Sequence, residues 1–186
     1  EEVSKLIQDA VISIEDQRFY EHKGIDFKAL LRALRANTTQ GSVVQGGSTI
    51  TQQYVRNVVL EEKQKTVDRK VREAILAWQF ERRYSKKQIL EGYLNVVYFG
   101  SRAYGVQAAA KVFFNTDANS VNLAQAATLA GLLASPEAYN PYEHPDAALQ
   151  RRNVVLDKMQ ELNKASLVDV TAAKAAPLDL QSALEP

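Results

Sequence analysis

Residues 67–83 read VDRKVREAILAWQFERR, and this stretch indicates the kind of element from which the chain is built. Its apolar residues Val71, Ile75 and Trp78 follow one another at intervals of four and three, which is the spacing of one face of an α-helix. The first proline of the chain is Pro136, so no proline interrupts a helix here. The stretch therefore predicts one long helix over roughly 67–83.

Helical spacing continues on both sides of this stretch. Apolar residues predict a helix over roughly 3–14, a second over 27–34 with Asp26 as its N-cap, and a third over 50–58. The tetrads 85–88 and 122–125 have the form of capping boxes, each of which opens a further helix. No sustained alternating pattern predicts a strand, so the expected fold class is mainly α.

The composition bounds the class of protein. The chain has 186 residues, 46% of them hydrophobic and 24% charged, which excludes a disordered chain and suits one domain or one domain with two lobes. It has no cysteine, which excludes a disulfide framework and cysteine-based chemistry. No apolar run reaches the ~18–20 residues of a spanning helix, and no signal peptide opens the chain. Its abrupt start and end predict a piece of a longer protein whose anchor lies elsewhere.

Acidic residues stand at the expected end of the first helix. Glu15 and Asp16 are followed by Phe19, His22 and Gly24. A carboxylate at a helix end that faces a loop can act as a general base. Adjacent acids are also common on solvated helix surfaces, and a single histidine is more often structural than catalytic. The combined spacing is harder to explain as a surface feature.

Residues 46–53 read GGSTITQQ and join a glycine-rich loop to a helix start. Exposed N–H groups at such a start favour anions, and the side chains of Ser48, Thr49, Gln52 and Gln53 suit sugar or phosphate oxygens. The structural alternative is a serine N-cap after a glycine turn. It explains the glycine and the serine, but it does not explain the two adjacent glutamines.

Basic residues concentrate between residues 56 and 87. Arg69 and Glu73 are four apart and share a helix face, which Lys70 borders. An ordinary ion pair between residues four apart accounts for this pattern. The functional alternative is a carboxylate held among cations beside a polyphosphate. Together with Glu15, such a cluster predicts displacement at a sugar carbon, with a carboxylate as base and a pyrophosphate as leaving group.

These motifs, in this order, resemble those of glycosyltransferase family 51, the peptidoglycan polymerases found alone or in class A penicillin-binding proteins. The resemblance rests on ED-x-x-F-x-x-H-x-G at 15–24, GGSTITQQ at 46–53, RK-x-x-E at 69–73 and K-x-x-ILE-x-YLN at 86–95, and it covers roughly residues 3–175. It implies a lysozyme-like helical fold with a large lobe and a small membrane-proximal lobe.

The resemblance also implies the activity. The substrate is lipid II, and the product is a β-1,4-linked glycan formed with inversion and release of undecaprenyl pyrophosphate. By position, Glu15 is the catalytic base and Glu73 the second essential carboxylate. The implied substrate-binding residues are Asp16, Phe19, His22, Ser48, Thr49, Gln52, Gln53, Arg56, Lys65, Arg69 and Lys70. Arg56 stands where the family often has lysine, and moenomycin is the implied inhibitor.

The resemblance further sets expectations about organisation and partners. Residues 1–175 form the glycosyltransferase domain, residues 37–65 approximate a mobile loop with the small lobe, and 176–186 begin a linker to a transpeptidase domain. No tightly bound cofactor is expected, although a divalent cation, Mg²⁺ or Mn²⁺, is compatible with Glu73. The expected partners are lipid II, the growing glycan and the membrane surface, with no nucleic acid. The expected location is the extracytoplasmic face of the bacterial cytoplasmic membrane.

Two alternatives come from other classes of protein. A lysozyme-like hydrolase also uses paired carboxylates, but it has no need of a cationic cluster beside the second one. A non-catalytic basic helical module would bind nucleic acid through residues 56–87. Five acidic residues within that stretch and the chain's net charge of +1 argue against the second alternative.

Overall fold

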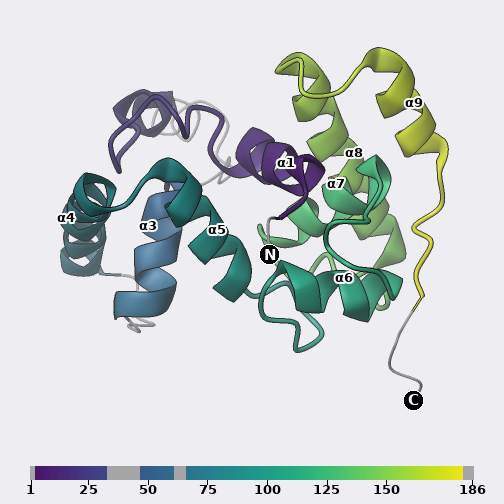
Figure 1. The fold of residues 1–186 in the computed structure, drawn as a ribbon, viewed down its shortest axis with the longest axis horizontal. Coiled ribbons are helices and arrows are strands. Elements are labelled where there is room, and N and C mark those ends of the chain that lie inside the picture. The colour runs from purple at the N-terminus through teal and green to yellow at the C-terminus, as the bar shows by residue number, and fades with distance from the viewer. Residues whose placement is uncertain (1–2, 33–46, 61–65, 182–186) are drawn as a thin grey trace. The chain divides into compact units, whose positions relative to one another are not determined.

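The computed structural model describes residues 3–32, 47–60 and 66–181, and it confirms that the fold is mainly helical (Figure 1). The helices in chain order are α1 (Lys5–Glu15), α3 (Ile50–Val55), the π-helical turn η1 (Arg56–Leu60), α4 (Val67–Arg83), α5 (Lys86–Val96), α6 (Val106–Phe114), α7 (Leu123–Leu132), α8 (Pro145–Glu161) and α9 (Leu167–Ala175). Residues 27–32 are also helical. In the described part of the chain, extended pairing is limited to one bridge between Tyr98 and Tyr104.

The predicted helix starts are confirmed by their hydrogen bonds. The backbone N–H of Ala29 donates to the carboxylate of Asp26 at 3.0 Å, as expected of an N-cap. Ser85 and Gln88 form the predicted capping box, because Gln88 Oε1 accepts from the Ser85 N–H and Ser85 Oγ accepts from the Gln88 N–H. Asn122 and Gln125 do the same at the start of α7. Local sequence therefore set these boundaries.

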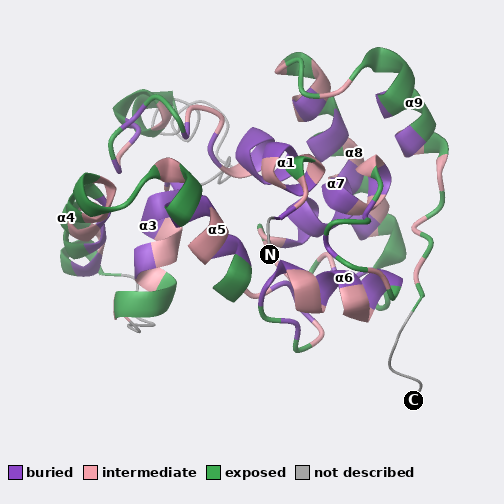
Figure 2. Ribbon diagram, viewed as in Figure 1, coloured by how far each residue is buried: buried purple, intermediate pink, exposed green. Residues whose placement is uncertain are grey.

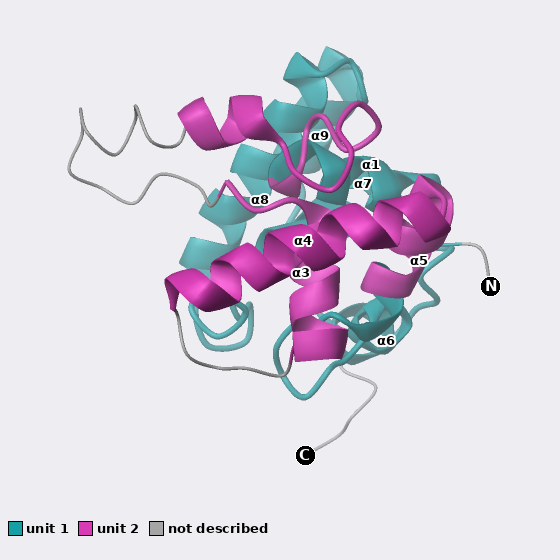
Figure 3. Ribbon diagram, turned by 90° about the vertical axis from the view of Figure 1, so that its left-hand side faces the viewer, with its two compact units in different colours: residues 1–14, 94–186 teal, residues 15–93 magenta. Residues whose placement is uncertain are grey.

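The chain divides into two compact units, residues 15–93 and residues 1–14 with 94–186 (Figure 3). The first of these, called the site unit below, is wider in sequence than the small lobe expected at 37–65. The second is called the C-terminal unit. The boundaries expected for the domain, the small lobe and the linker stay predictions.

The C-terminal unit is a set of helices packed around α7, which contacts α6, α8 and α9. Small residues on α7 allow this close packing, and Gly131 lies against Arg151 of α8. Arg152 is buried, and its guanidinium donates to the carbonyl oxygens of Lys174 at 2.9 Å and Ala176 at 2.7 Å. These bonds satisfy carbonyls at the end of α9 and fix that helix to α8.

The site unit is built on α4, against which α3 packs. Its apolar core is small, and its fully buried apolar residues include Phe19, Ile50, Val55, Ala77 and Ile89. The loop after α1 also meets α4 closely. Gly24 has a φ of +87°, and a Cβ there would lie 2.7 Å from the backbone of Ala77 and Trp78. Only glycine fits this approach.

Helix α4 buries two charged residues and exposes several apolar ones, and Figure 2 shows the exposed positions of the helix in green. Its buried residues are Arg69, Glu73 and Ala77. Its apolar residues Val71 and Trp78 are 53% and 45% exposed. The pattern that predicted the helix therefore marks the face that the site unit leaves uncovered. No helix in the described ranges is long and apolar enough to cross a membrane.

We expect Gly24→Ala to lower the free energy of unfolding by more than ~2 kcal/mol, since it combines a disfavoured positive φ with a backbone clash. Chemical denaturation measures the change. The matched control is Gly131→Ala, whose Cβ would meet the flexible side chain of Arg151 at 3.0 Å in a helix that favours alanine. A control change below ~1 kcal/mol is expected; equal losses in both variants would contradict the argument.

Candidate active site

Glu15 is the last residue of α1 and is partly exposed. Its Oε2 accepts a hydrogen bond of 2.8 Å from the side-chain amide of Gln53 on α3. The amide oxygen of Gln53 in turn accepts from the hydroxyl of Tyr93 on α5 at 2.9 Å. The predicted base therefore forms one end of a chain of two hydrogen bonds that runs through Gln53 to Tyr93.

Glu73 occupies a different environment, because its side chain is fully buried among cations. Arg69 Nη1 lies 3.2 Å from Oε2, Lys70 Nζ lies 2.5 Å from Oε1, and Arg56 Nη1 lies 3.9 Å from Oε2. A carboxylate without such partners would be too costly to bury. Three positive charges against one negative leave this cationic cluster with a net charge of +2.

The outer members of the cationic cluster reach solvent. The side chains of Lys70 and Arg56 are 44% and 35% exposed, whereas that of Arg69 is only 10% exposed. Lys70 Nζ also donates to Ser48 Oγ at 2.5 Å, which brings the loop before α3 to the same place. The excess charge is therefore presented outward by flexible side chains, as a site for an anion requires.

Helix α3 links the two carboxylates. Gln53, which binds Glu15, and Arg56, which approaches Glu73, are three residues apart at the end of α3 and lie on one face of the helical turn. The structure thus brings together Glu15, Gln53, Arg56, Arg69, Lys70, Glu73 and Ser48 of the predicted site. Lys65 and residues 37–46 of the predicted loop lie outside the described residues.

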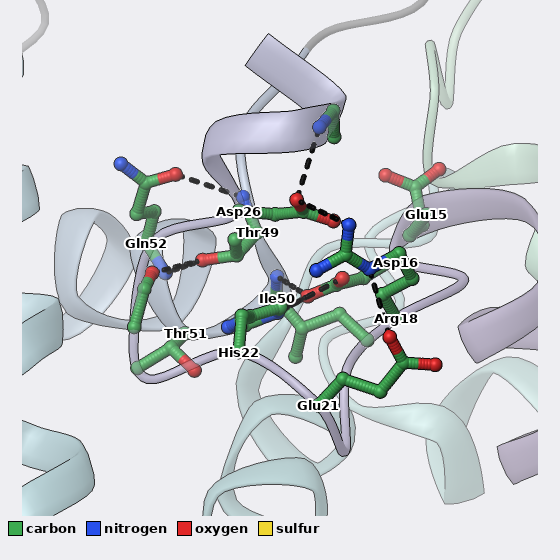
Figure 4. A network of polar contacts seen from close by, with 12 residues as sticks. Glu15, Asp16, Arg18, Glu21, His22, Asp26, Thr49, Ile50, Thr51 and Gln52 are labelled. Atoms are coloured by element: carbon green, nitrogen blue, oxygen red, sulfur yellow. Dashed lines mark hydrogen bonds and ion pairs between the residues drawn. The ribbon is translucent and has the colours of Figure 1, made fainter. Parts of the chain in front are cut away.

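Asp16 and His22 belong to a buried network of hydrogen bonds (Figure 4). The Asp16 carboxylate accepts from His22 Nε2 at 2.9 Å and from the backbone N–H of Ile50 at 3.0 Å. Because a carboxylate only accepts, Nε2 must carry the hydrogen. The other ring nitrogen of His22, Nδ1, lies 3.4 Å from Lys86 Nζ, which donates to Glu81 at 2.7 Å.

Thr49 and Gln52 also have internal partners. Thr49 is the N-cap of α3 and forms a capping box with Gln52, so the cap is one residue later than the serine considered from the sequence. The Thr49 hydroxyl also donates to the carbonyl of Gly24 at 2.7 Å. Phe19 is fully buried, with the Lys86 ammonium 4.5 Å from the centre of its ring.

These five side chains, Asp16, Phe19, His22, Thr49 and Gln52, were predicted to bind substrate, yet each is buried and engaged inside the site unit. They hold the loops that carry the exposed groups, and their predicted contacts with substrate stay predictions. The capping box explains Gln52 without any ligand, and Glu15 accounts for Gln53. The two adjacent glutamines therefore have different structural roles: Gln52 caps α3, and Gln53 donates to Glu15.

Sequence reasoning did not assign a role to Tyr93, Glu81 or Lys86. Thr51 Oγ1 donates to Glu81 at 2.5 Å, so Glu81 joins the network around His22. Burial, followed by the nearby charge of Glu15, raises the pKa of Tyr93 well above its ordinary value. The position of Tyr93 in the fourth motif was the one available signal, but a tyrosine in a helix is usually explained by packing.

The donor set does not suit a metal ion held by protein ligands. Both oxygens of Glu73 are engaged by cationic side chains, which would repel a divalent cation. Over the described residues, no group of three or more histidine, cysteine or acidic side chains is arranged to hold a metal. The positive charge at this site therefore comes from the side chains of Arg56, Arg69 and Lys70.

A partly exposed carboxylate that α3 links to a cationic cluster is an arrangement typical of an enzyme that transfers a group. Comparison with known proteins gives the family. A family model described as transglycosylase matches residues 1–160, so the chain belongs to the transglycosylase family. The resemblance of its ordered motifs and the prediction of a peptidoglycan glycosyltransferase are thereby confirmed at the level of the family.

Curated relatives agree. The chain is 51% identical over 162 residues to penicillin-binding protein 1A/1B of Bacillus subtilis. The aligned region covers 87% of the chain and 18% of that protein. It is 47% identical over 161 residues to penicillin-binding protein 1A of Aquifex aeolicus, covering 87% of the chain and 22% of that protein. The chain thus spans about a fifth of the length of these relatives.

Among solved structures, penicillin-binding protein 1A from Haemophilus influenzae matches with a TM-score of 0.48 and 24% identity. The match covers 73% of the chain and 17% of that structure.

We expect Glu73→Gln to lower the free energy of unfolding by about 3 kcal/mol, because it leaves the cationic cluster without its buried counter-charge. Pyrophosphate should then raise the melting temperature of the variant more than that of the parent, since the anion replaces the lost charge. Thermal denaturation with and without pyrophosphate measures both effects. Glu161→Gln, at an exposed ion pair of α8, is the control. A variant that pyrophosphate does not stabilise would contradict anion binding at this cluster.

Proposed function

We propose that this chain polymerises lipid II into β-1,4-linked glycan, with inversion at the donor carbon and release of undecaprenyl pyrophosphate. The observation that carries the proposal is the link through α3, whose Gln53 holds Glu15 while its Arg56 approaches Glu73. Family membership supports the reaction class.

In the proposed reaction the acceptor hydroxyl attacks the anomeric carbon of the donor sugar. The new carbon–oxygen bond forms as the bond to the pyrophosphate oxygen breaks, and the electron pair leaves with the pyrophosphate. Glu15 takes the proton of the attacking hydroxyl. One displacement from the face opposite the leaving group inverts the anomeric carbon.

The cationic cluster has the larger task in this reaction. Negative charge grows on the departing pyrophosphate, and the exposed ends of Arg56 and Lys70 can meet it without being reorganised. Arg69 and Glu73 lie deeper and fix the positions of those ends. A carboxylate base typically contributes about 10²–10⁴-fold to the rate.

The alternatives fit these features less well. A hydrolase that cleaves glycan releases a sugar hydroxyl, which needs a proton donor and gains nothing from a net charge of +2 around Glu73. A nucleic-acid module needs its basic residues at the surface, yet Arg69 is buried against Glu73.

We further propose that the uncovered apolar face of α4 rests on the membrane that holds the lipid substrate. Val67, Val71, Ile75 and Trp78 recur at intervals of four, four and three, and all four are between 45% and 81% exposed. A continuous apolar stripe of this kind suits the boundary between headgroups and acyl chains. Val58 and Val59 of η1 are exposed too, whereas Val55 at the end of α3 is buried and is not available for such contact.

The catalytic role proposed for Glu15 can be tested by polymerisation. In detergent, the protein should convert fluorescent lipid II into long glycan, and Glu15→Gln should make at least ~10²-fold less while its melting temperature stays close to that of the parent. Gel separation of the products measures both length and amount. A matched control is Glu21→Gln, which alters an exposed carboxylate paired with Arg18. A folded parent that cleaves preformed glycan and makes none would support the hydrolase instead.

The proposed membrane contact of α4 can be tested by fluorescence. Trp78 is the single tryptophan of the chain, so its fluorescence reports directly on α4. Vesicles should shift its emission to shorter wavelengths, and Val71→Asp should weaken vesicle binding roughly tenfold because it places a charge in the apolar stripe. Leu167→Asp, at an exposed position of α9, is the control. An emission maximum unchanged by vesicles would contradict membrane contact through this face.

A further inference from the structure

Tyr93 is buried and lies outside every predicted contact with substrate, yet its hydroxyl reaches the residue that holds Glu15. The link runs from the Tyr93 hydroxyl to Gln53 Oε1 at 2.9 Å and from Gln53 Nε2 to Glu15 Oε2 at 2.8 Å. Three elements are joined in this way: α5, α3 and the end of α1.

The chemistry of the three groups fixes the direction of both hydrogen bonds. An ionised carboxylate only accepts, so Gln53 must turn its NH₂ group toward Glu15. Its carbonyl oxygen then faces Tyr93 and needs a donor. The raised pKa of Tyr93, caused first by burial, keeps the hydroxyl protonated as that donor.

Two groups select this orientation of the amide: the Glu15 carboxylate accepts from the NH₂ end, and the Tyr93 hydroxyl donates to the oxygen end. The terminal torsion of a glutamine side chain has a broad, roughly two-fold energy profile, so the amide turns easily when one anchor is removed. Turning it over would place the amide oxygen against the Glu15 carboxylate, which repels it. The hydroxyl of Tyr93 is therefore the second anchor that holds the Gln53 amide in line with Glu15.

The position of the tyrosine is itself held by packing. The neighbouring Gly92 lets α5 approach Tyr54 of α3 so closely that an added Cβ would lie 2.5 Å from the Tyr54 hydroxyl. The Tyr93 side chain has no exposed surface. A rigid side chain at a fixed separation from α3 is what a positioning residue requires.

We propose that Tyr93 is a positioning residue for the reaction: through Gln53 it orients the carboxylate of Glu15 for proton transfer from the acceptor hydroxyl. This inference rests on the proposed function for its catalytic consequence, but the orientation of Gln53 can be tested without activity.

The test compares the parent, Tyr93→Phe, Gln53→Ala and the double variant in the lipid II assay. Tyr93→Phe should lower kcat roughly 3- to 30-fold with little change in KM, as expected when one hydrogen bond that acts on the chemical step is lost. In the Gln53→Ala background the same change should lower kcat less than twofold, because its route to Glu15 is already removed. Tyr84→Phe, at an exposed position, is the matched control.

A pH profile separates positioning from mere destabilisation. A hydrogen bond donated to a carboxylate favours its ionised form, so loss of the Gln53 orientation should move the acidic limb of the kcat profile to higher pH. A variant that is less stable but still correctly arranged would keep the limb in place. Independent effects of Tyr93→Phe and Gln53→Ala on kcat, or an unmoved limb, would overturn the inference.

The second measurement is the exchange of the Gln53 side-chain amide protons with solvent, followed by NMR and assigned by the signal that Gln53→Ala removes. The parent should protect these protons, and Tyr93→Phe should speed their exchange roughly tenfold. Unchanged exchange overturns the inference whatever the activity. Faster exchange with an inactive parent would uphold the orientation by Tyr93 and count against the proposed function alone.

Discussion

The burial of one carboxylate, Glu73, is the constraint on which the site unit depends. A charge with no exposed surface must be met by cations, and Arg56, Arg69 and Lys70 meet it from η1 and α4. Glu73 and Arg69 of α4 are accordingly turned inward, and the apolar residues Val71, Ile75 and Trp78 of the same helix stay exposed. The same requirement also decides how α3 lies on α4, since Arg56 at the end of α3 belongs to the same cluster. An excess of positive charge is the consequence, and it forms the chemically distinctive feature of the site.

A second buried carboxylate, Asp16, organises the other half of the site unit. It accepts from the first backbone N–H of α3 and from His22, and so joins the loop after α1 to the start of α3. Glu15 directly precedes Asp16, and its side chain accepts a hydrogen bond from Gln53, which is also on α3. The two adjacent acids thus differ: Asp16 is engaged in internal hydrogen bonds, whereas Glu15, the proposed base, stays partly exposed.

This division of labour explains why many residues of the motifs do not face outward. Thr49, Gln52 and Phe19 stabilise the loops and the start of α3, and the groups they support are Glu15, Gln53 and the cationic cluster. A site that must hold a base near a cluster of like charges needs rigid support, because the cations repel one another when no anion is bound. The dense internal bonding of the site unit supplies that rigidity.

The sequence by itself determined the helices, their caps and the chemical groups available, because helical periodicity and capping depend on residues within one or two turns. The order of the motifs was also enough to indicate the family. Only the tertiary structure decided which polar residues are internal and which are exposed, since Glu15 and Gln53 are 38 residues apart and Gln53 and Tyr93 are 40 apart. No local pattern encodes such pairings. The same reason applies to α4, where periodicity predicted a helix but not that Glu73 and Arg69 would be buried, with Arg56 of another element beside them.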